Sequence, residues 1–238
     1  MSSSGLDCFA GFAILRLINC CDTLDKAQVF IRFHCELSRS KFYYFGLIKQ
    51  GVKHTIKENK SYFLTMTIVD WVDVFCRKEQ RDIMVNALKY CIAEKGLNVY
   101  AYCIMTNHVH LIANCNEPFQ LKDTIWDLKK YTSKAIIREI KNGKESRRSW
   151  LLEKFENAGK KSVKNKTYKV WQTGNHAIEL YNSKFSWRKV NYIHQNPVKA
   201  GFVKRAEDWI YSSASNYMVE KENILAEVSC LTVPLANH

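Results

Sequence analysis

The chain has 238 residues, of which 47% are hydrophobic, and its 36 Lys and Arg against 23 Asp and Glu give a net charge of +13. This hydrophobic content excludes a disordered chain, and no apolar run reaches the ~18 residues that would span a bilayer. The charge favours a polyanionic partner, either nucleic acid or an anionic membrane surface. Nine scattered cysteines, without a repeated CxxC pair, indicate reduced thiols and therefore a cytoplasmic protein.

Residues 1–56 show no clear periodicity, and we interpret them as an N-terminal extension that is accessory or poorly ordered. They precede a predicted domain over residues 57–221 and a tail over residues 222–238. A zinc site in the extension is an alternative, although its cysteines are adjacent in place of the usual C-x₂₋₄-C spacing. The ligand types that it would use are Cys20, Cys21, His34 and Cys35.

Regular structure is predicted from Tyr62 onward, in the order β-α-β-β-α. Tyr62–Val69 alternates as a strand does, and Lys78–Lys95 has apolar residues at helical spacing. Val99–Met105 and His108–Ala113 predict two neighbouring antiparallel strands, and Leu121–Ile140 predicts a second amphipathic helix. This order is typical of a ferredoxin-like fold, an α+β antiparallel sheet with helices packed on it.

A ferredoxin-like sheet needs one more strand, and Thr167–Trp171 is the predicted closing strand. Further helices are predicted at Ser146–Ala158 and Lys184–His194. The second of these should end before Pro197, because the residue before a proline disfavours the helical conformation. We therefore expect extra C-terminal helices beside the sheet.

The positive charge is concentrated between Lys141 and Lys169, where ten Lys and Arg stand against three Glu. Such a run can be a solvated surface. However, aromatic residues interleave with the charges, as they do where single strands stack their bases at ~1–3 kcal/mol each. We predict DNA contacts in this region at Arg147, Arg148, Lys160, Lys161, Lys164, Lys166 and Trp171.

His108 and His110 are separated by one apolar residue in a predicted strand, so both side chains project from the same face. Two neutral imidazoles supply two ligands to a divalent ion and leave positions for a third ligand, water and substrate. Alternatively, they are ordinary polar residues on an exposed face. The apolar strand and the basic charge favour the metal site.

Tyr131 lies on the predicted helix Leu121–Ile140, at the edge of its apolar face. Lys129, Lys130 and Lys134 surround it and are themselves candidate DNA contacts. Neighbouring cations favour a phenolate, which makes Tyr131 a candidate nucleophile, although packing is the alternative role.

Together these segments resemble the IS200-like, REP-associated tyrosine transposase family, over roughly Tyr62–Tyr217 and in the family's order. His108-Val109-His110 matches the HUH motif, in which U is a bulky apolar residue, and Tyr192–Gly201 matches the distinctive YIHxNPVKAG segment. The other matching segments are YFLTMTIVDWVDVF, LKKYTSK, VWQTGNHAIEL and WIYSSASNY.

The resemblance implies a single-tyrosine nuclease on a ferredoxin-like sheet, in which His108 and His110 hold Mg²⁺ or Mn²⁺ against the scissile phosphate. A helix tyrosine, by position Tyr131, attacks and leaves a 5′-phosphotyrosine link and a free 3′-OH, which can be rejoined to another end. The implied substrates are single-stranded DNA ends, often beside imperfect hairpins, and the protein would act as a monomer or a homodimer.

The chain departs from the family pattern at the third metal ligand. In related transposases a polar residue one helical turn after the tyrosine, commonly Gln, completes the site, whereas Ala135 stands four residues after Tyr131. Asp127 and His176 are the available substitutes. This departure keeps open a second hypothesis, a DNA-hairpin-binding protein without the reaction. A third, an unrelated metal enzyme with the same histidine pair, leaves the basic segment without a purpose.

Overall fold

The computed structural model describes residue 56 and residues 60–162, 167–218 and 223–232, all of which belong to one compact unit, Lys53–His238. The candidate zinc ligands of the extension and two of the predicted DNA contacts, Lys164 and Lys166, lie outside the described residues. Within the described ranges, no helix combines the length and the apolar character that crossing a membrane requires.

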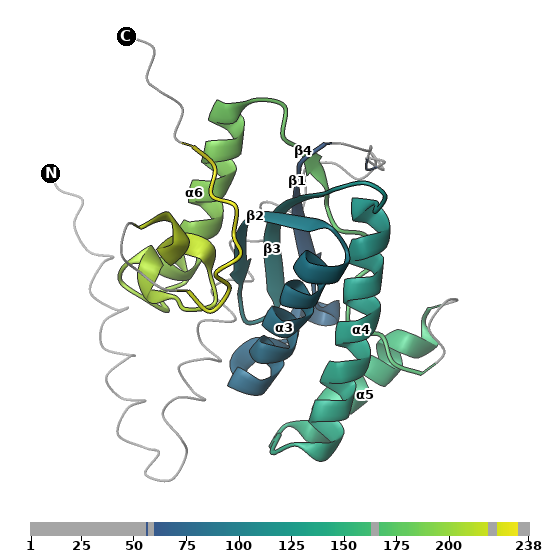
Figure 1. Cartoon of the computed structure of the whole chain (residues 1–238). Coiled ribbons are helices and arrows are strands. Elements are labelled where there is room, and N and C mark those ends of the chain that lie inside the picture. Colours follow the sequence, from purple (N-terminus) through teal and green to yellow (C-terminus); the bar gives the residue numbers. More distant parts are fainter. Residues whose placement is uncertain (1–55, 57–59, 163–166, 219–222, 233–238) are drawn as a thin grey trace, which may run out of the picture. The chain divides into compact units, whose positions relative to one another are not determined.

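Four antiparallel strands form the central sheet, in the spatial order β2-β3-β1-β4 (Figure 1). The strands are β1 (Tyr62–Thr67), β2 (Leu97–Ile104), β3 (His108–Cys115) and β4 (Ile178–Glu179). β1 pairs with β3 along its whole length, from Tyr62 opposite Ala113 to Thr67 opposite His108. With a helix after β1 and another after β3, this arrangement confirms the predicted ferredoxin-like fold.

Helices cover both faces of the sheet (Figure 1). The α-helices are α3 (Lys78–Glu94), α4 (Leu121–Asn142), α5 (Arg148–Lys160) and α6 (Ser183–Lys199). Short 3₁₀ helices are η1 (Val69–Trp71), η2 (Val74–Cys76), η3 (Ala206–Asp208) and η4 (Ser213–Tyr217).

The two faces of the sheet have separate hydrophobic cores, as the alternation of side chains along each strand requires. Leu64 of β1 and Leu111 of β3 belong to the larger core, which is completed by α3, α4 and α5. Phe63 and Ile112, which point the other way, belong to a smaller core with Val190 of α6. Helices α3 and α4 therefore lie on one face of the sheet, and α6 lies on the opposite face.

The closing strand is not where the sequence pattern predicted it. Within Thr167–Trp171, only Trp171 forms a bridge, to Ile68, and the fourth strand is the two-residue β4 farther along the chain. Gly174 and His176 have φ angles of +85° and +43°, which take the chain out of the extended conformation before β4 begins.

Two predictions near the C-terminus are also corrected. Helix α6 continues through Pro197 to Lys199: the proline removes one backbone hydrogen bond, the one to the carbonyl four residues earlier, but the Ala200 amide still donates to the Asn196 carbonyl at 2.9 Å. The predicted tail contributes to the domain: Leu225 is completely buried, and the Ser229 amide donates to the Val99 carbonyl at 2.8 Å. This contact covers the outer edge of β2.

The buried His194 of α6 should make stability depend on pH. Its Nε2 lies 2.8 Å from Ser213 Oγ, and burial lowers the pKa of His194 to about 4. As the pH falls, the unfolded chain binds the proton first. The free energy of unfolding should therefore fall between pH 6.5 and 4, by on the order of 2 to 3 kcal/mol from this group. Urea unfolding of the wild type and His194→Gln at pH 7 and 4.5 measures the effect; an equal loss in both proteins would contradict it.

Candidate active site

The histidine pair lies on β3, on the face of the sheet that α6 covers. His108 and His110 stand opposite Thr67 and Thr65 of β1, and their ring centroids are 4.7 Å apart. Both residues are buried, at 4% and 3% exposure, so the alternative of an exposed strand face does not hold. Buried polar groups require partners, and a pair of imidazoles set side by side in a core is therefore a candidate functional site.

In both rings, Nδ1 forms a hydrogen bond with an oxygen atom of another side chain. His108 Nδ1 lies 2.7 Å from Asn107 Oδ1, and His110 Nδ1 lies 3.0 Å from Thr65 Oγ1. The Nε2 atom of His110 is buried and has no hydrogen-bond partner among the described residues. His110 therefore has a hydrogen bond at Nδ1 and no partner at Nε2 among the described residues, which is the arrangement of a metal-binding histidine with its supporting hydrogen bond.

Burial keeps both imidazoles neutral. It lowers the pKa of His108 to about 4, and the pKa of His110 lies well below its usual value because of burial, the neighbouring His108 and the charge of Lys189. The neutral form is the one that binds a divalent ion, so at pH 7 neither ring must lose a proton to do so.

The tyrosine beside the histidine pair is Tyr192 of α6. Its ring centroid lies 5.3 Å from that of His110 and 5.9 Å from that of Phe63. One helical turn farther on, Asn196 Nδ2 donates to the Tyr192 carbonyl oxygen at 2.8 Å. Burial raises the pKa of Tyr192, so the phenol is protonated at neutral pH.

Tyr131 is not beside the pair, which corrects the expected juxtaposition. It lies on α4, which packs on the opposite face of the sheet, and its side chain is 56% exposed. Asp127, one turn before it, pairs with Lys95 at the end of α3 over 3.3 Å, so this side of α4 faces α3. A helix pattern defines the buried stripe of a helix but not the face of the sheet that receives it.

The two candidate substitutes for the third metal ligand also lie apart from the pair. Asp127 shares the far face with Tyr131, and its carboxylate is engaged by Lys95. His176 is exposed and sits in the loop before β4. Among the described residues, no group of three His, Cys, Asp or Glu is placed to hold a metal ion.

Three of the predicted DNA contacts, Trp171, Lys129 and Arg147, form hydrogen bonds or ion pairs within the protein instead. Trp171 is only 5% exposed, and its Nε1 donates to the buried Thr132 Oγ1 at 3.0 Å, so no base can stack on it. Lys129 Nζ donates to the carbonyl oxygens of Gln172 and Gly174, both at 2.9 Å. The loop before β4 is thereby tied to α4.

Arg147 is engaged in the same way, since its guanidinium pairs with the buried Glu145 at 3.2 Å and donates to the Asp73 carbonyl at 3.0 Å. The remaining predicted contacts that the structure describes are exposed and lie on α4 and α5 or just after it: Lys130, Lys134, Arg148, Lys160 and Lys161. They remain predictions.

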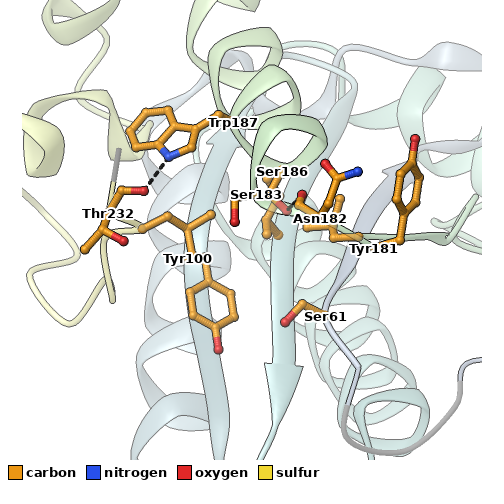
Figure 2. Close-up of a pocket in the computed structure, with 11 residues that line it drawn as sticks. Ser61, Tyr100, Tyr181, Asn182, Ser183, Ser186, Trp187 and Thr232 are labelled. Carbon is orange, nitrogen blue, oxygen red and sulfur yellow. Dashed lines mark hydrogen bonds between the residues drawn. The ribbon is translucent and has the colours of Figure 1, made fainter. Parts of the chain in front are cut away.

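A cavity of about 310 Å³ opens at the N-terminal end of α6 (Figure 2). Trp187 and Tyr100 contribute aromatic walls, and Trp187 Nε1 donates to the Thr232 carbonyl at 2.6 Å, so the C-terminal segment closes one side. Ile112, which also lines the cavity, follows His110 by two residues on β3 and shares its face. The cavity and the histidine pair therefore lie on one side of the sheet.

Tyr192 and Asn196, which the structure places beside the histidine pair and on the same helix, were not among the predicted site residues, although the sequence carried a signal for them. Both stand in the YIHxNPVKAG segment, and they have the spacing, a tyrosine and an amide four residues later, that the family pattern expects. The sequence favoured Tyr131 as the nucleophile because lysines surround it.

Comparisons with known proteins agree with this fold. The family model described as "Transposase IS200 like" matches residues 58–196, more than half of the chain. A structure of a REP-associated tyrosine transposase bound to a REP hairpin is 19% identical, with a TM-score of 0.51, and the match covers 71% of this chain and 84% of that one.

A crystal structure of a Deinococcus radiodurans R1 protein assigned as a transposase is 16% identical, with a TM-score of 0.37, over 63% of this chain and 97% of that one. No match is found among curated protein sequences. The extent of the family match decides the assignment: the chain belongs to the IS200-like transposase family.

Proposed function

We propose that this transposase cleaves and rejoins single-stranded DNA in a metal-dependent reaction, with Tyr192 in the place of Tyr131 as the nucleophile. The observation that carries the proposal is the contact between the Tyr192 ring and His110, whose buried Nε2 has no hydrogen-bond partner among the described residues. A buried, neutral histidine pair next to a helix tyrosine is what the reaction requires.

His108, His110 and Asn196 are the residues that would hold Mg²⁺ or Mn²⁺. The Asn196 side chain uses Nδ2 for its hydrogen bond to Tyr192, which keeps its oxygen, a ligand type that these ions favour, for the metal. When bound, the ion neutralises charge on the phosphoryl oxygens of the scissile phosphate. Asn196 replaces Asp127 and His176 as the candidate third ligand.

In the chemical step, Tyr192 Oη forms a bond to phosphorus as the bond from phosphorus to the 3′ oxygen breaks. The phenol proton ends on the released 3′-hydroxyl, directly or through solvent, and the 5′ phosphate stays on the tyrosine. The reverse reaction with another 3′-hydroxyl joins two ends. Each step exchanges one phosphodiester for another, so it needs no external energy source.

A DNA hairpin is the proposed partner, because the fold relative with the higher TM-score is bound to a REP hairpin. Positive charge is available beside Tyr192: Lys189 Nζ lies 5.7 Å and Lys199 Nζ lies 5.9 Å from the centre of its ring. These lysines are suited to the phosphates next to the scissile bond, and the exposed lysines of α4 and α5 to more distant ones.

Metal binding tests the proposed ligands without DNA. In a titration followed by the electron paramagnetic resonance signal of free Mn²⁺, we expect one site in the wild type. His108→Ala and His110→Ala should each abolish binding at the concentrations used, and Asn196→Ala should weaken it about tenfold or more. The matched controls are Asp127→Asn and His176→Ala, which should bind like the wild type. Loss of binding in a control, with the histidine variants unaffected, would contradict the assignment.

One observation favours the second candidate, a hairpin-binding protein without the reaction: no third His, Cys, Asp or Glu joins the pair within the described residues. Incubation with a labelled hairpin oligonucleotide and Mn²⁺, followed by denaturing electrophoresis, separates the two. A covalent protein–DNA product supports the transposase reaction. Tight hairpin binding without such a product supports the second candidate.

A further inference from the structure

The turn between β2 and β3 connects His108 to an acidic residue outside the sheet. Asp73, just before η2, accepts two hydrogen bonds on its Oδ1 atom, from Thr106 Oγ1 at 2.6 Å and from Asn107 Nδ2 at 3.0 Å. Its own backbone carbonyl accepts a hydrogen bond from Arg147 Nη1 at 3.0 Å. Arg147 therefore fixes the backbone of Asp73, and the Asp73 carboxylate in turn fixes the side chains of Thr106 and Asn107 in the turn.

These contacts determine which way the Asn107 amide points. A carboxylate only accepts hydrogen bonds, so the NH₂ group of Asn107 must face Asp73. The amide oxygen then faces His108 and lies 2.7 Å from its Nδ1. An amide oxygen also only accepts, so His108 Nδ1 must carry a hydrogen. A neutral imidazole has one N–H, and the lone pair is therefore on Nε2.

His110 lacks such a constraint. The partner of its Nδ1 is Thr65 Oγ1, a hydroxyl, which can either donate or accept. The hydrogen bond therefore holds the ring of His110 in place without selecting its tautomer. The two histidines differ in this respect although they lie on the same strand and face.

We propose that Asp73 and Asn107 are positioning residues, which hold His108 as the Nδ1–H tautomer and so present its Nε2 lone pair to the metal. The tautomer follows from the contacts alone, whereas its use in metal binding rests on the proposed function. Partners of this kind, behind a metal-binding histidine, typically contribute 10- to 100-fold to metal affinity.

Nuclear magnetic resonance measures the tautomer directly. Long-range ¹H–¹⁵N correlations of ¹⁵N-histidine-labelled, metal-free protein at pH 7.5 should give His108 a protonated Nδ1 and an unprotonated Nε2. In Asn107→Ala the acceptor is gone, and we expect the proton to be distributed over both nitrogens. Mn²⁺ affinity should fall 10- to 100-fold in the same variant. Should Asn107→Ala not fold, Asn107→Ser keeps a polar turn with a side chain too short to bridge both partners.

Two further variants separate positioning from general damage to the hairpin. Asn114→Ala removes a 2.9 Å hydrogen bond to Asn98 at the far end of the same hairpin, and should leave the tautomer and the Mn²⁺ affinity unchanged. The exchange Asp73→Asn with Asn107→Asp restores a donor at 73 and acceptors at 107. It should therefore restore the Nδ1–H tautomer.

A wild-type His108 protonated at Nε2, or a tautomer unchanged in Asn107→Ala, would overturn the proposal. Failure of the proposed function looks different. In that case the tautomer would respond to Asn107 as expected, while no variant, nor the wild type, would bind Mn²⁺ or form a covalent product with DNA.

Discussion

Tyr192→Phe should abolish the covalent protein–DNA product and reduce cleavage of a hairpin oligonucleotide roughly a thousandfold or more. The substitution removes only the hydroxyl, whereas the ring that packs against His110 and Phe63 remains. Hairpin affinity, measured by fluorescence anisotropy, and the urea unfolding midpoint should therefore stay close to the wild-type values. Denaturing electrophoresis of the labelled oligonucleotide in the presence of Mn²⁺ measures both the product and the cleavage rate.

Tyr131→Phe is the matched control, since it removes a hydroxyl from an exposed tyrosine on the opposite face of the sheet. We expect it to form the covalent product at the wild-type rate. If Tyr131→Phe lost the product while Tyr192→Phe kept it, the nucleophile would be Tyr131 and the contact between Tyr192 and His110 would be packing alone.

Trp171→Ala should destabilise the domain by about 3–5 kcal/mol. The indole is 5% exposed, packs at 5.8 Å from the Phe75 ring, and donates a hydrogen bond to Thr132. Its removal leaves a cavity in the larger core and a buried hydroxyl without its donor, and both effects raise the free energy of the folded state. Urea unfolding at pH 7 measures the loss.

Trp150→Ala is the comparison, because Trp150 is a tryptophan within the basic segment Lys141–Lys169 and is 46% exposed on α5. Its effect on stability should be within about 0.5 kcal/mol. Hairpin affinity of the two variants at low temperature, where both are folded, separates core packing from base stacking. A Trp171→Ala protein of unchanged stability and weakened hairpin binding would restore the stacking interpretation.

Much of the fold could be predicted because it depends on local patterns. The alternation in Tyr62–Val69 and the helical spacing in Lys78–Lys95 come from side chains that must reach one hydrophobic core, so periodicity alone located β1 and α3. The closing strand could not be located in this way. β4 has two residues, Ile178 and Glu179, too few for a period, and it forms because the preceding loop places them against β1.

The predicted DNA contacts show the same limit for charged and aromatic residues. Composition identified a concentration of Lys, Arg and Trp, but the geometry of the partners decides which of them are available to DNA. Arg147 is committed to Glu145 and Asp73, and Lys129 to the loop before β4. Lys134, on the same helix as Lys129, is exposed, and the sequence around the two lysines does not tell them apart.

By itself, the sequence determined the order of the main elements and the family. It also placed His108 and His110 on one face of a strand, because side chains two residues apart on a strand point the same way. The tertiary structure decided which tyrosine meets them. Tyr131 and Tyr192 both lie on amphipathic helices, but α4 packs on the far face of the sheet and α6 on the face of the histidines. The face that a helix covers is decided by the chain connections and by long-range packing, which helical periodicity does not encode.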